Sequence, residues 1–310
     1  MASAAMTRLR SRMTGPRREI LYFYIFISPW IIGFLLFMAG PILASAVLSF
    51  TSYDAIHLPS FIGLKNYTDL ATDELFWQSL KVTTIYTLVS VPLGIVLSVL
   101  VAMLLNQKIP FLAFFRAVYY LPSVISGVAV ALLWMWIFNP DFGLLNWTLS
   151  TFLHIQGPQW LFSEQWVLPA LITMSLWGIG GGIVLYLAGL QGVPTELYEA
   201  ANIDGANALR RFWHVTLPMI SPVILFSLIT GMIASFQTFT QINIMTQGGP
   251  HYASLFYIYY LWQNAFGASF IDLGYASAMA WILFVLVLVL TLLALRSSRL
   301  WVYYEGGERA

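Results

Sequence analysis

The chain has 310 residues, of which 59% are hydrophobic and 9% are charged, and its formal net charge is +1. Roughly a quarter of the residues in a soluble domain are charged, so this composition predicts an integral membrane protein, and the near-neutral balance argues against nucleic-acid binding. The sequence has no cysteine and four scattered histidines without an HExxH arrangement, which excludes disulfides and thiol chemistry and disfavours a histidine-based metal site.

Six apolar stretches are long enough to cross a bilayer. A hydrocarbon core of about 30 Å needs roughly 20 apolar residues in a helix. The stretches of this kind lie near residues 20–50, 79–106, 117–138, 166–191, 219–243 and 273–295. They are continuous, without the alternation of lipid-facing strands, and so predict six membrane-spanning helices rather than a barrel. The first stretch follows several arginines, as a signal peptide does, but it is longer than the roughly 7–15 apolar residues of a signal sequence, and we interpret it as a span.

The distribution of positive charge predicts the orientation of these spans. With the N-terminus in the cytoplasm, 12 of the 14 Lys and Arg residues fall on the cytoplasmic side and only Lys65 and Lys81 fall outside. Positively charged residues favour the cytoplasmic loops, so both termini are predicted to be cytoplasmic. The domain organisation is then a cytoplasmic tail (1–19), a single membrane domain (20–295) with a cytoplasmic loop (192–218), and a second tail (296–310).

The spans contain little that would power transport. Their interiors have no Asp, Glu, Lys or Arg apart from Lys81 and Arg116 at the margins, and such residues are the usual carriers of proton or ion coupling. No GxxxxGK[ST] phosphate loop occurs in the sequence either. We therefore expect any transport to draw its energy from a partner. A free-standing channel or secondary transporter is the alternative, and a membrane enzyme is disfavoured by the lack of clustered catalytic residues.

The fourth span contains a glycine run, Gly180 to Gly182, which follows Gly178. This run is not a GxGxxG nucleotide motif, because Ile183 stands where the last glycine is required. The glycines have two interpretations of similar weight. They open a cavity or a flexible point, or they allow close packing of helices.

A polar insert, EAANIDGANALRRFWHVTLP (199–218), separates the fourth and fifth spans. Thr195 is a suitable cap for a helix of about nine residues, and Gly205 is suited to end that helix in a left-handed conformation. A second short segment follows and is expected to stop at Leu217 and Pro218. Because so short a helix is not stable alone in water, we expect it to dock on another surface.

These residues resemble a known family. Their spacing matches the EAA motif, EAA-x3-G-x9-I-x-LP, of permease subunits of binding-protein-dependent ABC importers, with Val215 where the motif has Ile. Six fixed identities at this spacing arise by accident on the order of once in ten thousand chains of this length. The matching residues are Glu199, Ala200, Ala201, Gly205, Leu217 and Pro218.

Other stretches are similar to the carbohydrate-import branch of the family, on the side of the maltose F-type and glycerol-phosphate A-type permeases. They are FIGLKNY (61–67), FRAVYYLPSVISGVAVALLWMWIFNPDFGLLN (115–146), MTQGGP (245–250) and AFGASFIDLGYASAMAWILF (265–284). The resemblance implies an all-α, type I ABC importer permease fold in the inner (cytoplasmic) membrane of a bacterium or archaeon. It also implies a non-catalytic subunit that moves a di- or oligosaccharide by alternating access.

The resemblance further implies partners. In the family the EAA segment is a coupling helix that inserts into a cleft of the ATPase subunit, with Glu199 making a polar contact, the two alanines allowing close approach and Gly205 forming the bend. The implied assembly contains a second homologous permease, two ABC ATPase subunits that hold ATP and Mg²⁺, and an external solute-binding protein. Segments 54–78 and 139–165 are candidates to contact that binding protein.

The fifth span carries the clearest polar side chains of the membrane domain. Gln237, Gln241 and Asn243 have near-helical spacing on about one face. They either bond another helix in the bilayer or reach sugar hydroxyls, with Trp177 or Phe236 stacking on the sugar ring.

Similarity to the maltose relatives, whose sugar contacts come from the fourth and fifth spans, implies candidate substrate residues. They are Trp177, Gly182, Phe236 and Gln237, and the polar spacing described above adds Gln241. Gly182 departs from the bulky residue expected there. The absence of basic residues in the spans disfavours a phosphate anion as solute.

Overall fold

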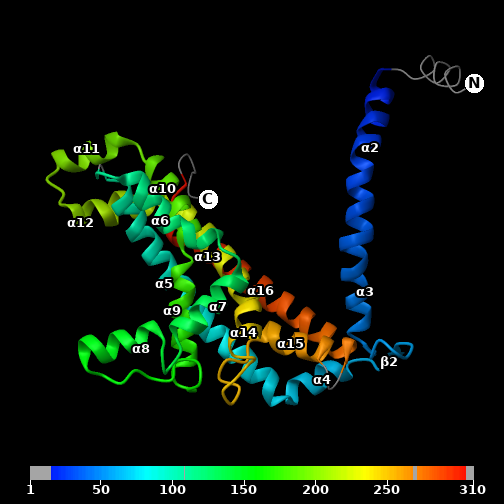
Figure 1. The fold of residues 1–310 in the computed structure, drawn as a ribbon. Coiled ribbons are helices and arrows are strands. Elements are labelled where there is room, and N and C mark those ends of the chain that lie inside the picture. Colours follow the sequence, from blue (N-terminus) through cyan, green and yellow to red (C-terminus); the bar gives the residue numbers. More distant parts are fainter. Residues whose placement is uncertain (1–14, 108, 268–270, 305–310) are drawn as a thin grey trace, which may run out of the picture.

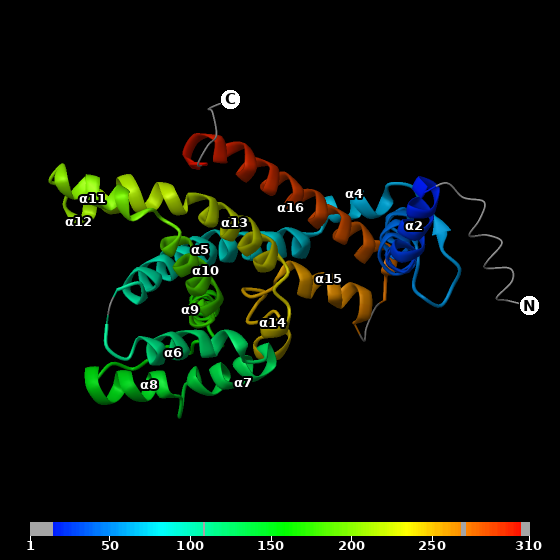
Figure 2. The same cartoon turned by 90° about the horizontal axis from the view of Figure 1, so that it is seen from above.

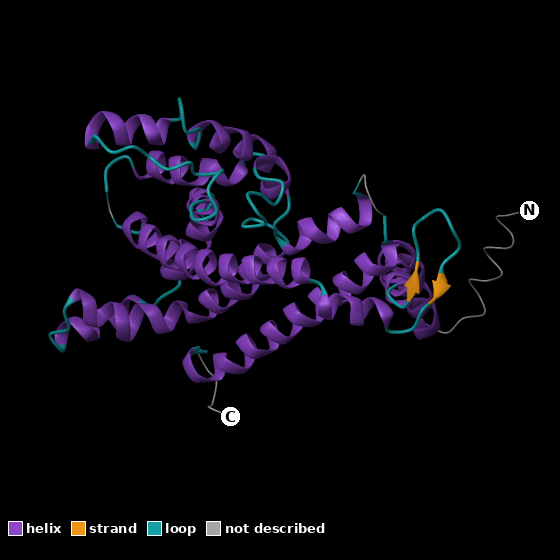
Figure 3. Ribbon diagram, turned by 90° about the horizontal axis from the view of Figure 1, so that it is seen from below, coloured by secondary structure: helices purple, strands orange, loops and turns teal. Residues whose placement is uncertain are grey.

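The computed structural model describes residues 15–107, 109–267 and 271–304, and these residues are mainly helical, with connecting loops and one short pair of strands (Figures 1 and 3). Four helices are long and apolar enough to cross a membrane, and there are six if each of two bent helix pairs counts as one span. Some charges used for the orientation prediction lie outside the described residues, as do the tail residues 1–14 and 305–310 and part of the 265–284 stretch. These charges are Arg8, Arg10, Arg12, Lys108 and Arg309.

The N-terminal helical segment stands apart from the rest of the molecule (Figure 1). It consists of α2 (Gly15–Phe34), a π-helical turn η1 (Leu35–Ala39) and α3 (Gly40–Leu48). The wide turn directly precedes Pro41, whose missing N–H and bulky ring do not fit a regular helix interior. None of the residues in the most apolar part of this segment is buried, and α3 alone packs against the C-terminal helix. The segment therefore offers its apolar side chains to surroundings other than this chain.

A short antiparallel hairpin follows at the end of α3. Its strands are β1 (Thr51–Ser52) and β2 (Ser60–Phe61), and the next helix is α4 (Lys65–Thr72). The buried Asn66 amide donates hydrogen bonds of 2.9 Å to two backbone carbonyls, those of Ser49 and Thr51. These bonds fix α4 to the end of the N-terminal segment.

Asp73 joins three helices at the same end of the molecule. Its Oδ1 accepts the Leu75 N–H at 2.9 Å and so caps α5 (Glu74–Leu105). Its Oδ2 accepts hydrogen bonds of 2.6 Å from the hydroxyls of Tyr260 in α15 (Tyr257–Phe266) and Tyr275 in α16 (Leu273–Trp301). Burial raises the pKa of this carboxyl, but the tyrosine and backbone hydrogen bonds outweigh burial and hold the pKa below its usual value.

Helix α5 is the centre of the membrane domain. It contacts α15 and three helices of the fourth and fifth spans, and Figure 2 shows α16 on one side of it and the α6 to α8 region on the other. These three helices are α9 (Val167–Trp177), α10 (Gly180–Gln191) and α13 (Leu217–Phe236).

Two of the expected spans are bent rather than straight. In the stretch 117–138, α6 (Leu112–Val124) and α7 (Gly127–Ile137) meet at 101°, because Ile125 and Ser126 have extended backbones with ψ of 139° and 136°. Pro122, in the last turn of α6, lacks the N–H that would bond the Val118 carbonyl, which weakens this end of the helix.

The second bend lies at the glycine run. Helices α9 and α10 meet at 49° around Gly178 and Ile179. A Cβ on Gly180 would lie 2.4 Å from the Tyr119 carbonyl oxygen of α6, so this glycine lets α6 approach α10. The packing interpretation of the glycine run therefore holds at Gly180.

The fifth span is interrupted near its end, within the candidate span Ala208–Met245. Helix α13 stops at Phe236, and α14 (Thr240–Met245) begins after a three-residue break. Residues 237–239 are not helical, so Gln237, Gln241 and Asn243 do not lie on one continuous helix as their spacing had suggested. The last helix, α16, continues beyond residue 295 to Trp301, and the N–H of Tyr303 then donates to Ser221 Oγ of α13 at 2.9 Å.

A helical segment projects sideways between the third and fourth spans (Figure 1). It consists of α8 (Leu144–Thr148) and the π-helical turn η2 (Leu149–Leu153). The Asn146 amide of this segment donates to the Pro140 and Pro158 carbonyls at 3.0 and 3.3 Å and accepts the indole N–H of Trp160 at 2.7 Å. One buried amide therefore holds both ends of this connection together.

Candidate functional site

The polar insert forms a helical hairpin at one end of the molecule (Figure 1). Its first helix is α11 (Thr195–Ile203), and its return consists of α12 (Ala208–Arg211) and the π-helical turn η3 (Phe212–Thr216). Across the base of the hairpin, Tyr198 Oη and Thr216 Oγ1 are hydrogen-bonded at 3.0 Å. Near the tip, the Arg211 guanidinium donates to the Asn202 carboxamide. The two arms are thus held to each other by polar contacts.

The turn of the hairpin has the conformation predicted for Gly205. Its φ is +73°, the Gly205 N–H donates to the Asn202 carbonyl at 3.1 Å, and the Ala206 N–H donates to the Ala201 carbonyl at 2.9 Å. This pair of bonds is a Schellman motif. A Cβ at Gly205 would meet no atom within 4 Å, so the requirement for glycine is conformational and not steric crowding.

Two details of the hairpin differ from the prediction. The side chain of Thr195 does not cap α11, because Thr195 is the first helical residue and Pro194 occupies the cap position. Leu217 and Pro218 do not end the return arm, since η3 runs directly into α13. Pro218 lies in the first turn of α13, and the preceding π-helical turn accommodates its missing N–H.

The outer face of the hairpin is free of contacts with the described part of the chain. Glu199 and Ala200 are exposed, whereas Ala201 is half-buried against the return arm. Two large apolar side chains at the tip are also exposed, Ile203 by 87% and Leu209 by 66%. Exposed apolar side chains gathered on one projecting surface indicate a surface that docks on another molecule.

A cavity of about 400 Å³ lies in the membrane domain between α5, the bent fourth span and α13. Most of its polar lining consists of hydroxyls, with one carboxamide. The polar side chains are those of Tyr86, Ser90, Ser98, Ser175, Tyr186, Ser227, Ser235, Thr238 and Gln241. No Asp, Glu, Lys, Arg or His is among its lining residues.

Two matching stripes of small residues form opposite walls of this cavity. On α5 the stripe is Ser90, Gly94 and Ser98, and on α13 it is Ser227, Gly231 and Ser235, a Ser-x3-Gly-x3-Ser pattern in both helices. Residues four apart lie on one helix face. These short side chains leave space while they present hydroxyls to it.

Some of these polar groups have no partner within the described part of the chain. The Tyr186 hydroxyl and Ser227 Oγ are buried without a hydrogen bond there. Ser235 and Thr87 of α5 are bonded to each other at 2.8 Å. Because a buried hydroxyl without a partner is costly, the cavity is suited to a ligand that supplies hydrogen bonds.

The structure brings two of the five candidate substrate residues to this cavity, Gly182 and Gln241. A Cβ on Gly182 would lie 3.0 Å from Ser98 Oγ. Phe236 does not reach the cavity, because it is 2% exposed and packs in an apolar cluster with Tyr257 and Met279.

Trp177 and Gln237 are also outside the cavity lining. The Trp177 ring lies edge-on to Trp134, with 6.1 Å between centroids. Gln237 is exposed because it caps the end of α13. The sequence analysis did not predict the serine stripes that line the cavity. The repeated Ser-x3-Gly-x3-Ser spacing was the signal in the sequence that could have indicated them.

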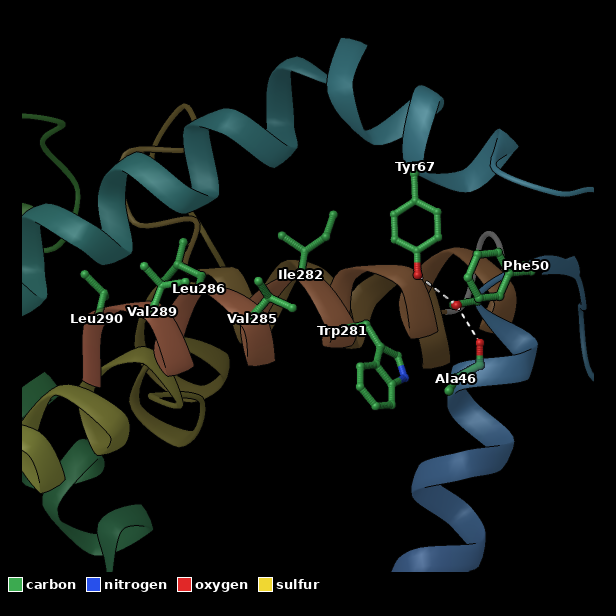
Figure 4. Close-up of a pocket in the computed structure, with 10 residues that line it drawn as sticks. Ala46, Phe50, Tyr67, Trp281, Ile282, Val285, Leu286, Val289 and Leu290 are labelled. Atoms are coloured by element: carbon green, nitrogen blue, oxygen red, sulfur yellow. Dashed lines mark hydrogen bonds between the residues drawn. The ribbon is translucent and has the colours of Figure 1, made fainter. Parts of the chain in front are cut away.

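An apolar groove, separate from the cavity beside α5, lies between α3 and α16 (Figure 4). It measures about 540 Å³. The Tyr67 hydroxyl closes one end by donating to Ser49 Oγ at 2.9 Å. Its walls are almost entirely apolar, and the labelled residues are Ala46, Phe50, Tyr67, Trp281, Ile282, Val285, Leu286, Val289 and Leu290. This groove lacks the hydrogen-bonding groups of the cavity beside α5.

The sequence of the chain is similar to those of known proteins. Residues 90–301 match the family of binding-protein-dependent transport system inner membrane components. The chain is 44% identical over 297 residues to the probable ABC transporter permease protein YesP of Bacillus subtilis (strain 168), covering 94% of this chain and 95% of YesP. It is 35% identical to the lactose transport system permease protein LacF of Rhizobium radiobacter, covering 89% and 93% of the two chains.

A solved structure has the same fold. A chain of a bacterial alginate ABC transporter, in complex with an alginate-pentasaccharide-bound periplasmic protein, superimposes with a TM-score of 0.81 at 24% identity. The superposition covers 93% of this chain and 98% of that chain. The type I ABC importer permease fold expected from the EAA segment is therefore confirmed.

Proposed function

The chain belongs to the family of binding-protein-dependent transport system inner membrane components, and we propose that it forms half of the passage by which a carbohydrate enters the cell. Membership makes it a multi-pass permease subunit of an ABC importer in the inner membrane, and a transport subunit rather than an enzyme. The proposal concerns the solute, the residues that contact it and the subunits that drive it.

The observation that carries the proposal is the hydroxyl-lined, uncharged cavity beside α5. A sugar presents several hydroxyl groups that both donate and accept hydrogen bonds, as serine and tyrosine hydroxyls do. The unpartnered Tyr186 and Ser227 hydroxyls offer such bonds. The lactose permease relative supports a carbohydrate as the solute, and the lack of basic lining residues favours an uncharged one.

Energy for transport enters through the hairpin of α11 and α12. We assign Glu199 as its polar contact with an ABC ATPase subunit and the exposed Ala200 as the point of closest approach. Ala201 and Gly205 set the shape of the hairpin from within, while Leu217 and Pro218 connect its return arm to α13, which lines the cavity. A pull on the hairpin is thereby transmitted to a wall of the cavity.

Besides this chain, the complete importer in this proposal has three kinds of component. Two ATPase subunits hold ATP and Mg²⁺, an external solute-binding protein delivers the sugar, and a second homologous permease forms the other half of the passage. The unburied apolar length of α2 and α3 supports a membrane partner for this chain. Closure of the ATPase dimer then switches the passage between inward and outward openings, which is alternating access.

The test replaces Glu199 in the complete importer, reconstituted in liposomes with the binding protein and labelled disaccharides. Glu199→Lys is expected to abolish ATP-driven uptake while the permease still inserts into the membrane. Glu196→Lys is the matched control, because Glu196 is also exposed on α11 and the charge change is identical. Normal uptake by the Glu199 variant would refute the coupling role. Uptake without ATP would instead support a channel or secondary transporter.

A further inference from the structure

The sideways segment of α8 and η2 exposes many apolar side chains although it lies outside the spans. Two of them, Trp147 and Phe152, are 55% and 69% exposed and contact each other edge-on at 6.1 Å. The other large apolar side chains exposed along it are Phe142, Leu144, Leu153 and Ile155. An apolar surface of this extent is not stable facing water and requires a covering.

The position of the segment identifies what covers it. In Figure 1, α8 lies across the direction of α2 and α3, at the level where α3 gives way to the β hairpin and α4. If α2 and α3 cross the bilayer, this level is its outer boundary. The segment is therefore placed where lipid headgroups meet acyl chains, and not at the depth of the cavity beside α5.

The apolar surface is also continuous with a membrane-facing surface. Helix α8 packs against α7, and α7 itself exposes Leu132 by 56% and Trp136 by 50%. Because α7 belongs to a bent span of an inner-membrane protein, these exposed side chains are placed to contact the bilayer. The exposed face of α8 extends that surface sideways.

The charge pattern favours lipid over a protein partner. Between Asp141 and Glu164 the sequence has no Asp, Glu, Lys or Arg. Thr148 and Thr151 supply hydroxyls on the same segment, and both are exposed. Amphipathic helices with aromatic and aliphatic side chains lie in the plane of the headgroup boundary, and tryptophan is enriched there.

The segment is held sideways by its own contacts. The Asn146 amide bonds described above fix its base, and a Cβ on Gly157 would lie 1.9 Å from the Asn146 Oδ1 atom. Glycine at 157 is therefore needed for the returning chain to pass this close. The segment cannot fold back onto the spans without losing these bonds.

We propose that the α8 and η2 segment is an interfacial helix whose apolar side chains insert into the outer leaflet, beside the outer end of α7. It acts as a lateral anchor for the bent third span and for the connection that leads to α9. The segment has no Asp, Glu, Lys or Arg, and His154 at its end is its single titratable side chain. Insertion therefore depends mainly on apolar contact, and we expect it to vary little with lipid headgroup charge or with salt at neutral pH.

The absence of cysteine in the chain allows a direct test with single spin labels in the complete importer, after any partner cysteines are replaced. Labels are attached at Phe152→Cys and Trp147→Cys in phosphatidylcholine nanodiscs. Collision with oxygen, which concentrates in lipid, is compared with collision with a water-soluble nickel chelate. Leu132→Cys on α7 is the membrane control and Asp69→Cys on α4 is the water control, since both side chains are exposed.

We expect both test labels to favour oxygen over nickel, at a depth between those of the two controls. Phosphatidylglycerol, high salt and the binding protein should leave these values unchanged. Nickel access equal to that of the Asp69 label would overturn the proposal. Protection of the labels from both reagents would also overturn the proposal, because such protection would place a protein on this surface. Protection that appears only when the binding protein is present would overturn it too and would assign the surface to that partner. Failure of the sugar proposal would not change any of these readings.

Discussion

The left-handed turn at Gly205 allows a quantitative test of how the hairpin is built. In Gly205→Ala the new Cβ meets no neighbouring atom, so the expected effect is the conformational cost alone. The left-handed region costs a non-glycine residue about 1–2 kcal/mol, which lowers the population of the closed turn by a factor of roughly 5–30. The substitution thus loosens the Schellman bonds without changing the docking surface itself.

Hydrogen exchange of a peptide that spans residues 199–210 measures this loosening in the membrane-embedded importer. We expect faster exchange by roughly the same 5- to 30-fold, and fewer sugar molecules imported per ATP hydrolysed. Gly205→Asn should retain most protection, because Asn tolerates the left-handed region better than Ala. Gly192→Ala is the matched control, since Gly192 has a right-handed φ of −80° and a Cβ there makes only ordinary contacts.

Exchange and coupling in Gly205→Ala equal to those of the parent protein would refute the conformational role of Gly205. It also fails if Gly192→Ala is as harmful as Gly205→Ala, since the effect would then follow from added volume rather than from backbone conformation.

Three further substitutions test other parts of the structure. Asp73→Asn should lower thermal stability by about 1.5–3 kcal/mol, the cost of lost hydrogen bonds to a charged group. The pKa of Asp73 is lowered in the folded state. Its contribution to stability is therefore present above the pKa of the unfolded state and is lost as the pH falls through the pKa of the folded state. Thermal unfolding of the parent and the variant should accordingly converge in strong acid. Gly182→Leu should fill the cavity and stop uptake, while the importer still assembles. Gly181→Leu is the control and should leave uptake intact, because a Cβ at Gly181 meets no atom within 4 Å. Equal uptake by the two variants would contradict the assignment of the cavity. Asn146→Ala leaves the Trp160 indole N–H without its partner and should cost about 1–3 kcal/mol in thermal unfolding, and an unchanged unfolding temperature would argue against that network.

Local features of the fold were predictable from sequence because single residues specify them. Gly205 could be predicted to end α11 since few residues other than glycine readily adopt φ of +73°. The family resemblance likewise rested on a short run of residues at fixed spacing. Hydropathy identified the apolar stretches because backbone groups in lipid must be satisfied within helices.

The bends and helix ends depended on tertiary contacts and were not predicted. Pro122 signals a weak point in α6, but the 101° angle also requires α10 to offer Gly180 as a packing surface. The end of α13 at Phe236 carries neither glycine nor proline. Phe236 packs into the core instead, and this packing displaces Gln237 from the face on which helical periodicity had placed it.

The cavity was missed because each of its serines is isolated within a strongly apolar helix. A hydropathy window averages Ser90 and Ser98 with the leucines and valines around them, and the same holds for Ser227 and Ser235. The repeated Ser-x3-Gly-x3-Ser spacing gives two polar stripes, but only the packing of α13 against α5 brings the stripes to one space.

The central claim is that this chain works as one subunit of an ATP-driven importer. The most direct measurement is to extract the tagged chain from its native membranes in mild detergent and to identify every co-purifying chain by mass spectrometry. We expect to recover a second, homologous permease and an ATPase with a phosphate loop. In Glu199→Lys the ATPase should be lost or weakened, whereas the second permease should be retained. Recovery of the chain alone, or only with copies of itself, would contradict the claim.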